Sequence, residues 1–542
     1  MLCDVCKQSL EGMNDPIVTP HLRAVQQGEH RSRGTLFDIE KHVFGHHRTR
    51  DSLVQSIKQQ CLLSVKFKDH EHNLTRADDD FLTSFNLFVY EKEKRIFVNL
   101  MWRGTRAGTL SILLPLESMQ EKADLILELN DNTDGQHSRR LIDGWDKNCL
   151  AKHSRCTRTG DSAFLPTKIL EFEDGSNPTT CRLVLREEIY SNSRYTALSY
   201  RWGTAGKPGK LCLLQSTFDT IRSGLPLGSL SKTYVDAIHV TARLGIRYIW
   251  IDALCIIQDS PKDWRVEAAT MQAVYRNSYL TISAVAGAHD DSGLFYSRDP
   301  AKVQPTVVNI AYTSYDKPKT FVCSDETQAV EASFRLGNVT RKRGWCPQER
   351  LLPCRVLHFG SQQVFWECHE QHASETMPWS MSYGHWDRDL PRKRLWKLSI
   401  GETLFLDPED PYTTLFLEWY AMISIYSNCQ LTHASDKLVA ISGLANDMRS
   451  ALNTRRPHTH HTYIADLWAE DLRFGLCWSL DGFGSRSAVY RAPSWSPMSL
   501  DGSIHWNGSP KRDEFTWHVT NANCTAATRY INDLDTGEVT SA

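Results

Sequence analysis

The sequence predicts an α/β core, with a mostly parallel sheet and flanking helices, embedded in a larger α+β protein. Between residues 195 and 294, short apolar strands alternate with amphipathic helices, which is the order that parallel strands and their crossover helices require. The strands are continuous apolar runs, as expected where both faces of a sheet are covered. Serine and glycine stand at the helix ends, so the helices carry boundary signals of their own.

The first strand covers 196–200, and a helix follows over 230–244. One face of this helix carries residues at helical spacing, namely Tyr234, Ala237, Ile238, Thr241 and Ala242. Gly245 ends the helix, because glycine readily adopts the backbone conformation of a C-terminal cap. The aromatic and β-branched run 247–251 then predicts a buried central strand, and Asp252 follows at its carboxyl end.

A second helix begins after Ser260, whose side chain can cap it, with Pro261 in the first helical position. Four residues at helical spacing are expected to face the core, namely Trp264, Ala268, Met271 and Tyr275. Glu267 borders this apolar stripe, so its carboxylate is either solvated or drawn into a crevice. The run 280–284 predicts the next strand.

Polar side chains gather where the predicted strands end. In open α/β sheets, ligands bind in the crevice outside the carboxyl ends of the strands. The candidate ligand-binding residues are Arg201, Trp202, Asp252, Gln258, Asp259 and Trp264. A structural role fits as well, with Asp252 capping a loop, Asp259 beside a helix N-terminus and Glu267 in a salt bridge. The sequence leaves both interpretations open.

Four motifs in this stretch resemble the heterokaryon-incompatibility (HET) domain of filamentous fungi, namely YxALSYxWG, RYxWIDxLCIxQD, DWxxExxxMxxVYxNS and a closing GL. The resemblance implies a cytoplasmic effector of non-self recognition that triggers growth arrest or programmed cell death. It also implies a partner, which is either an incompatibility protein or a second copy of the chain.

HET domains have been compared with TIR domains, some of which cleave NAD with a glutamate. By that likeness the core would be TIR-like, with Glu267 as the catalytic residue and NAD as the substrate. The alternative is a noncatalytic signalling module that acts by self-association or partner binding. A third hypothesis is a zinc-dependent interaction protein whose N-terminal cysteines and histidines carry out the recognition.

Charge and composition exclude several classes of function. The formal net charge of −2 gives no electrostatic footprint for nucleic acid or an anionic membrane. No apolar run approaches the roughly 18 residues of a membrane span, and the opening MLCDVCKQSL lacks the apolar core of a signal peptide. The fifteen cysteines, an odd number, fit reduced thiols in the cytosol better than a disulfide framework.

A chain of 542 residues is too long for one core, so two or three domains are expected. We divide it into an N-terminal region containing cysteine and histidine (1–160), the HET core (161–300), an associated extension of strands and a helix (301–375) and a mainly helical C-terminal region (376–542). This division rests on changes in composition and period along the chain.

Further helices and strands are predicted outside the core. In the N-terminal region we expect a helix over 51–60 and a hairpin formed by 85–90 and 95–99. In the C-terminal region, apolar residues at helical spacing predict helices over 412–426 and 463–478.

Cysteine and histidine residues near the N-terminus suggest a zinc site. Cys3, Cys6, His47 and Cys61 would supply the four nitrogen and sulfur ligands that a structural zinc ion takes. In the N-terminal regions of HET proteins a second cysteine commonly follows the last of these by three residues, but this chain has Ser64 there. The competing interpretation is that the cysteines pack as small buried hydrophobic residues.

Three other patterns are given structural interpretations. Cys149, His153 and Cys156 have metal-like spacing, but we favour packing in the core for them. Cys368 is followed closely by two histidines, which a strand end explains equally well. The glycine- and lysine-containing loop 204–210 is not a phosphate-binding loop, because no serine or threonine follows its last lysine.

Overall fold

The computed structural model describes residues 2–10, 41–45, 47, 49–61, 63–64, 67, 83–90, 95–102, 105–115, 129–156, 164–173, 175, 177–202, 211–310, 319–324, 343–378, 411–431, 433–506, 530–532 and 539–541. The predicted loop 204–210 lies outside these residues. Along the described chain, no helix is long and apolar enough to cross a membrane.

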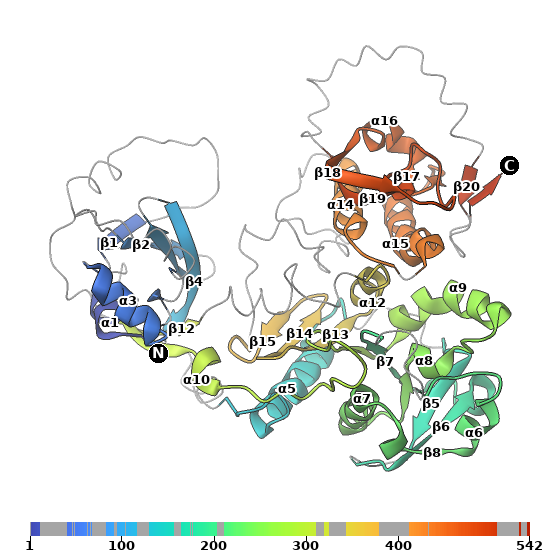
Figure 1. The fold of residues 1–542 in the computed structure, drawn as a ribbon, viewed down its shortest axis with the longest axis horizontal. Helices are drawn as coiled ribbons and strands as arrows, with labels where there is room; N and C mark the ends of the chain where they lie inside the picture. The colour runs from blue at the N-terminus through green and yellow to red at the C-terminus, as the bar shows by residue number, and fades with distance from the viewer. Residues whose placement is uncertain are drawn as a thin grey trace.

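The centre of the molecule is a sheet of nine strands in the order β15-β14-β13-β10-β7-β9-β5-β6-β8 (Figure 1). The strands are β5 (Lys168–Phe172), β6 (Thr180–Leu185), β7 (Thr196–Ser199), β8 (Leu225–Pro226), β9 (Tyr248–Trp250), β10 (Leu280–Ser283), β13 (Arg355–Phe359), β14 (Val364–Cys368) and β15 (His372–Ser374). The predicted strands 196–200, 247–251 and 280–284 are β7, β9 and β10, each shortened by one or two residues. An α/β core is therefore confirmed.

The sheet is mixed instead of mostly parallel. Parallel pairing joins only β13, β10, β7 and β9. The hairpin of β5 and β6 joins β9 antiparallel, while β14 and β15 continue antiparallel from β13. Short connections favour antiparallel neighbours, whereas the helical crossovers between β7, β9 and β10 permit parallel ones. The alternating stretch of sequence thus predicts the parallel centre and not the margins.

Helices cover this sheet. They are α5 (Gln136–Lys152), α6 (Phe218–Ser223), α7 (Lys232–Arg243), α8 (Asp252–Cys255), α9 (Pro261–Asn277) and α12 (Cys346–Leu351). Helix α7 contacts β9, α8 contacts β5, α6 contacts β6, and α5 contacts β14. The predicted inward face of α7 is confirmed, since all five of its residues are buried. Gly245 follows this helix with φ +71°, the left-handed conformation expected of its cap.

Helix α9 begins as predicted but buries a different face. The Ser260 side chain accepts a hydrogen bond from the backbone N–H of Asp263, and Pro261 opens the helix. The buried residues of the helix, however, are Glu267, Met271, Val274 and Tyr275. Trp264 is exposed, so its placement in the core stripe is wrong. The first helical turn extends past the core, and the carboxylate of Glu267 takes the inward position.

The N-terminal region forms a second sheet, with the strand order β1-β2-β3-β4-β12-β11 (Figure 1). Its strands are β1 (Lys41–Gly45), β2 (Thr83–Tyr90), β3 (Arg95–Trp102), β4 (Thr105–Pro115), β11 (Thr306–Ile310) and β12 (Lys319–Ser324), beside helices α1 (Asp4–Leu10) and α3 (Arg50–Lys58). The helix expected at 51–60 and the hairpin of 85–90 with 95–99 are confirmed. The chain returns to this sheet after the core, because β12 pairs with β4.

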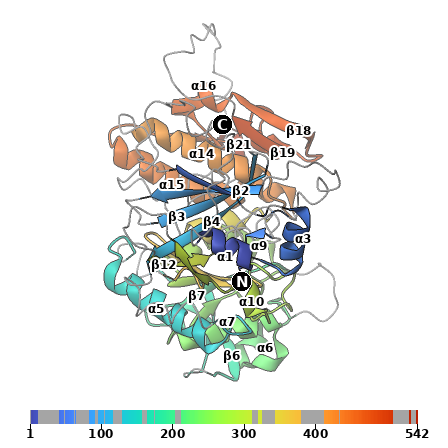
Figure 2. The ribbon, with the colours of Figure 1, turned by 90° about the vertical axis from the view of Figure 1, so that its left-hand side faces the viewer.

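The C-terminal region combines helices with short strands, which lie together in both views (Figures 1 and 2). It contains α14 (Pro411–Ser427), α15 (Val439–Arg455), β16 (Tyr463–Ile464), β17 (Leu467–Trp468), α16 (Leu472–Gly475), β18 (Trp478–Arg486), β19 (Leu500–Trp506), β20 (Tyr530–Asn532) and β21 (Val539–Ser541). The helix expected at 412–426 is confirmed as α14. Helix α15 contacts α9 and α12, so this region packs on the core.

The continuous helix predicted over 463–478 is wrong. A tight hairpin of β16 and β17 begins the segment, and the four-residue α16 follows it. Ala465 and Asp466 form the turn with φ values of 44° and 74°. Positive φ at both central residues suits a two-residue hairpin, which a helix cannot accommodate. The apolar spacing was real, but it reflects burial of the hairpin's side chains and not a helical face.

Candidate functional site

The carboxyl ends of β7, β9 and β10 meet at one edge of the central sheet. In the chain, β7 leads to β9 on one side, whereas β10, on the other side of β7, leads away to β13. The connections therefore diverge between β7 and β10. The crevice outside the strand ends at such a point is where α/β proteins bind ligands.

Trp202 and Asp252 meet at this edge. The Trp202 indole Nε1 donates a hydrogen bond of 2.7 Å to Asp252 Oδ2, and the backbone N–H of Ala253 donates one of 2.7 Å to Oδ1. The indole is 41% exposed, whereas Asp252 is only 9% exposed. Burial raises the pKa of the Asp252 carboxyl, against the opposing effect of Arg343 and Trp202. An exposed aromatic ring thus covers a buried carboxylate.

Two residues that our sequence analysis did not assign to the site complete it. Ser199 Oγ, at the end of β7, donates a hydrogen bond of 2.5 Å to Glu349 in α12. The Arg343 guanidinium hydrogen-bonds the carbonyl oxygen of Tyr200 and lies 3.9 Å from Glu349. Their only sequence signal is the stretch RGWCPQER, which is far from the strands in the chain. We call Ser199, Trp202, Asp252, Arg343 and Glu349 the carboxyl-end cluster.

The charges of the carboxyl-end cluster are strongly coupled. Burial raises the pKa of Glu349, while Arg343 and Ser199 act in the opposite direction. Burial also disfavours the Arg343 cation, but Glu349, Cys346 and Asp252 outweigh it and raise the guanidinium pKa. One permanent cation and two acids therefore sit beneath the exposed indole. Such a set can bind a ligand that has a planar ring and hydrogen-bonding groups.

The other candidate binding residues are less central. Gln258 Nε2 donates to the carbonyl oxygens of Asp252, at 3.0 Å, and Ile256, at 2.9 Å, so it fixes the loop after β9. Asp259 Oδ1 accepts a hydrogen bond of 2.9 Å from the backbone N–H of Gln215. Arg201 and Trp264 are exposed. The structure thus brings Trp202, Asp252 and Gln258 together and leaves Trp264 on the outside of α9.

Glu267 lies in a separate polar group at the start of β5. Its Oε1 accepts a hydrogen bond of 2.7 Å from Lys168 Nζ and another from the Thr167 hydroxyl. Lys168 also bonds Asp263 Oδ1 at 2.7 Å. Burial disfavours the lysine cation, but its hydrogen bonds to the two carboxylates outweigh this and raise its pKa. We call these four residues the lysine pair group.

The two polar groups do not touch through Glu267. Among the described residues, its carboxylate bonds Thr167 and Lys168 and neither Trp202 nor Asp252. Glu267 is only 1% exposed, and its second oxygen, Oε2, has no hydrogen-bond partner within the described part of the chain. A buried carboxylate oxygen without a donor is costly and points to a strained or functional position.

The N-terminal cysteines and His47 also come together. Cys3 Sγ lies 3.6 Å from His47 Nε2, and Cys6 Sγ lies 3.9 Å from the same atom. Cys61 Sγ lies 3.4 Å from Cys6 Sγ, and the three thiols lie within 4.8 Å of one another. His47 Nδ1 lies 2.7 Å from Ser52 Oγ, a partner that fixes the ring.

These residues fit a structural zinc ion by their chemistry, with three sulfurs and one imidazole nitrogen. Ser64 stands among them, with its hydroxyl 3.5 Å from Cys6 Sγ and 3.1 Å from His47 Nε2. It therefore occupies the place that a further cysteine would take, and His47 supplies the fourth ligand instead.

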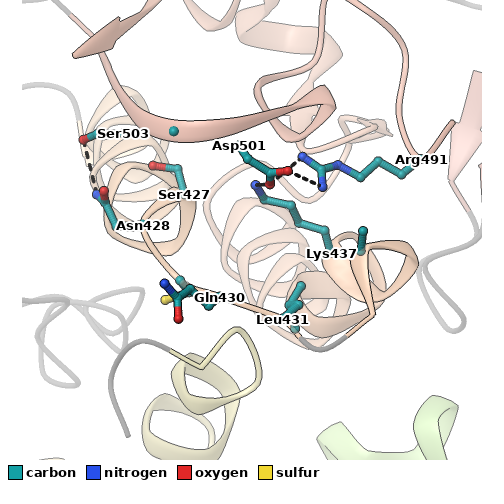
Figure 3. Close-up of a pocket in the computed structure, with 11 residues that line it drawn as sticks. Ser427, Asn428, Gln430, Leu431, Lys437, Arg491, Asp501 and Ser503 are labelled. Atoms are coloured by element: carbon teal, nitrogen blue, oxygen red, sulfur yellow. Dashed lines mark hydrogen bonds and ion pairs between the residues drawn. The ribbon is translucent and has the colours of Figure 1, made fainter. Parts of the chain in front are cut away.

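A cavity of about 360 Å³ lies in the C-terminal region, between the end of α14 and the hairpin of β18 and β19 (Figure 3). Lys437 and Arg491 both reach it, but Asp501 accepts hydrogen bonds from each, at 3.1 Å and 2.7 Å. The cations are thus neutralised within the wall of the cavity, and it offers no evident chemistry.

Comparison with protein families shows where the chain is related to others. Residues 195–349 match the family described as heterokaryon incompatibility protein (HET). No curated protein and no solved structure matches the chain, so the likeness of the core to TIR domains stays a prediction. The match spans β7 to α12 and includes every residue of the carboxyl-end cluster. The chain contains a HET domain, which implies a role in heterokaryon incompatibility.

Proposed function

We propose that this protein is a cytoplasmic effector of fungal non-self recognition, which arrests growth or kills the cell when its HET domain binds a ligand at the carboxyl-end cluster. The observation that carries the proposal is the hydrogen bond from Trp202 to Asp252, which joins two strand ends beneath an exposed ring. A surface built only for packing would not leave an indole 41% exposed above a buried carboxylate.

For the ligand we propose NAD, cleaved by a TIR-like reaction. Trp202 would stack on the nicotinamide or adenine ring, and Arg343 would face the negative charge of the phosphates. The glycosidic bond breaks with its electron pair leaving on nicotinamide, which forms an oxocarbenium-like ribose. Water then adds to that carbon and loses a proton to solvent. A carboxylate stabilises the cation, and Glu267 is our candidate for it because Oε2 lacks a partner.

A noncatalytic signalling module is the second candidate, and one observation favours it. The ion pair of Lys168 and Glu267, at 2.7 Å, joins β5 to α9 and is enclosed by protein. Such a pair can serve only to hold the helix on the sheet. In that case the HET domain would act by self-association or by binding an incompatibility partner.

The variant Glu267→Gln separates the two candidates. It keeps the volume of the side chain and removes its charge, whereas Glu187→Gln makes the same change at an exposed site as a control. Expressed at equal levels in a fungal cell, wild type and Glu187→Gln should deplete NAD and arrest growth, while Glu267→Gln should do neither. Killing by the Glu267→Gln variant, or killing by wild type with unchanged NAD, would overturn the hydrolase and leave the signalling module.

Ligand binding is tested apart from catalysis. Trp202→Ala removes the exposed ring, and calorimetric titration with NAD should show affinity lower by roughly 5- to 150-fold, the value of one stacking contact. Trp264→Ala removes an exposed tryptophan from α9 and tests whether that residue contributes as well. Equal affinity of wild type and Trp202→Ala would remove the carboxyl-end cluster as the binding site.

A further inference from the structure

A second cluster of thiols and imidazole lies between α5 and the central sheet. It contains Cys149, His153, Cys156 and Cys368, whose ligand atoms all lie within 4.8 Å of one another. The three cysteines are buried, and His153 is partly buried. None of these residues belongs to the stretch that matches the HET family.

The fold explains how these residues meet. Cys149 lies in the last turn of α5, and His153 is the residue that caps this helix. The chain then turns, since the backbone N–H of Cys156 donates a hydrogen bond of 3.0 Å to the carbonyl oxygen of His153. Cys368 is the last residue of β14, the strand that α5 contacts. Three ligands thus come from one helix end and the fourth comes from a strand more than two hundred residues later.

The contacts around the cluster are those of thiolates. Arg355 Nε donates to Cys149 Sγ at 3.2 Å, and the backbone N–H of Gln371 donates to Cys368 Sγ at 3.2 Å. Cationic and backbone N–H donors aimed at sulfur favour its negatively charged form, which is the form that binds metals. Buried thiols packed only as hydrophobic residues need no such donors.

His153 is oriented for the same centre. Its Nδ1 lies 3.3 Å from Cys368 Sγ, and its Nε2 lies 3.3 Å from the side-chain amide of Asn148. A partner on the second ring nitrogen is typical of histidines that bind metal through the first. No cysteine in the described part of the chain forms a disulfide, so the thiols are available as ligands.

We propose that Cys149, His153, Cys156 and Cys368 bind one structural Zn²⁺. Three sulfurs and one nitrogen form the closed tetrahedral set that structural zinc ions take. The ion ties the end of α5 to β14, next to the strands that carry the HET domain. Our sequence analysis favoured packing for the first three residues because Cys368, which completes the set, is distant in the chain.

A neighbouring set competes for one of these ligands. Cys156, Cys354 and His369 also lie within 4.8 Å of one another. This set offers only three ligands among the described residues, and His369 Nδ1 lies 3.4 Å from the carbonyl oxygen of Arg155. The set with Cys368 is complete, so we assign the ion to it.

The test is the zinc content of the full-length protein, purified without chelator. Cys368→Ser should lose one zinc ion per chain relative to wild type, whereas the matched control Cys181→Ser, at a buried cysteine outside both clusters, should lose none. Cys6→Ser removes a ligand of the N-terminal cluster only, so it reports that site separately. Unchanged zinc in Cys368→Ser would overturn the proposal, whatever the N-terminal cluster binds.

Two further measurements keep the test decisive if Cys368→Ser does not fold. X-ray absorption on Cys6→Ser should show sulfur ligands at about 2.3 Å and a nitrogen ligand at about 2.0–2.1 Å from zinc. His369→Ala should keep this ion. Loss of the ion in His369→Ala would transfer it to the competing set, and a disulfide found within the cluster by mass spectrometry would exclude zinc there.

Discussion

The HET domain contains two buried acidic groups that differ in how they meet the solvent. In the carboxyl-end cluster, the indole of Trp202 separates Asp252 from water and is itself half-exposed. In the lysine pair group, Glu267 is enclosed by Thr167 and Lys168, and no exposed ring covers it. The first arrangement can admit a ligand by a small movement at the surface, whereas the second must open an ion pair.

This difference indicates where binding and stability reside. A buried carboxylate is tolerated only with a compensating charge or hydrogen bonds. Arg343 lies near two acids and leaves the pKa of both Asp252 and Glu349 raised, so that cluster is incompletely compensated. Lys168 lies at 2.7 Å from both of its carboxylates. We therefore expect the carboxyl-end cluster to carry binding and the lysine pair group to carry more of the stability.

The largest expected effect concerns the strand that positions both groups. Trp250 in β9 is fully buried and packs edge-on against Tyr275 of α9, with ring centroids 5.7 Å apart. Trp250→Ala should lower the free energy of unfolding by roughly 3–5 kcal/mol, because it leaves a large cavity. Denaturant titration measures this, with Tyr190→Ala at an exposed site as the control. An unchanged midpoint would remove β9 from the core.

The next effect measures the lysine pair group directly. A double-mutant cycle of Lys168→Met and Glu267→Gln should give a coupling energy of about 1–3 kcal/mol, since the two side chains share a buried ion pair. The same cycle with Glu187→Gln in place of Glu267→Gln should give a coupling near zero. Coupling near zero in both cycles would mean that Glu267 gains nothing from Lys168, which would weaken the contrast between the two groups.

Local signals in the sequence predicted the elements of the core, and distant contacts limited the rest. Caps at Ser260 and Gly245 and the apolar period of α7 act within a few residues, so they can be interpreted from the chain alone. The burial of Glu267 cannot, because it depends on Lys168, which lies 99 residues earlier. Arg343 and Glu349 join the site through contacts that no short motif encodes.

The same limit applies to the sheets. The strands β11 and β12 were expected after the core, but their pairing with β4 joins segments about two hundred residues apart, and neither segment signals the other. Of the six candidate ligand-binding residues, Trp202 and Asp252 share a side-chain hydrogen bond because both follow parallel strands. Trp264 was misplaced because helical period defines a face but not where the core begins along it.

The smallest expected effect is a pH dependence specific to the carboxyl-end cluster. Burial raises the pKa of Glu349 above its ordinary value of about 4.3. Between that value and the raised one, the folded protein holds more protons than the unfolded chain, so the free energy of unfolding falls as the pH rises. The stabilising contribution is complete below the ordinary pKa and is lost as the pH rises through the folded pKa.

Glu349→Gln removes this titration and leaves Asp252 as a counter-charge for Arg343. Other buried carboxylates act in the opposite direction, since the pKa of Glu367 is lowered: burial raises it, but Arg350 and His358 outweigh that effect. The difference between wild type and variant therefore isolates Glu349. Across the acidic range, wild type should lose stability with rising pH relative to Glu349→Gln, by at most about 1.4 kcal/mol per pH unit. Parallel pH profiles of the two proteins would show that Glu349 is as well compensated as Glu267, and the proposed division between a binding group and a stabilising group would fail.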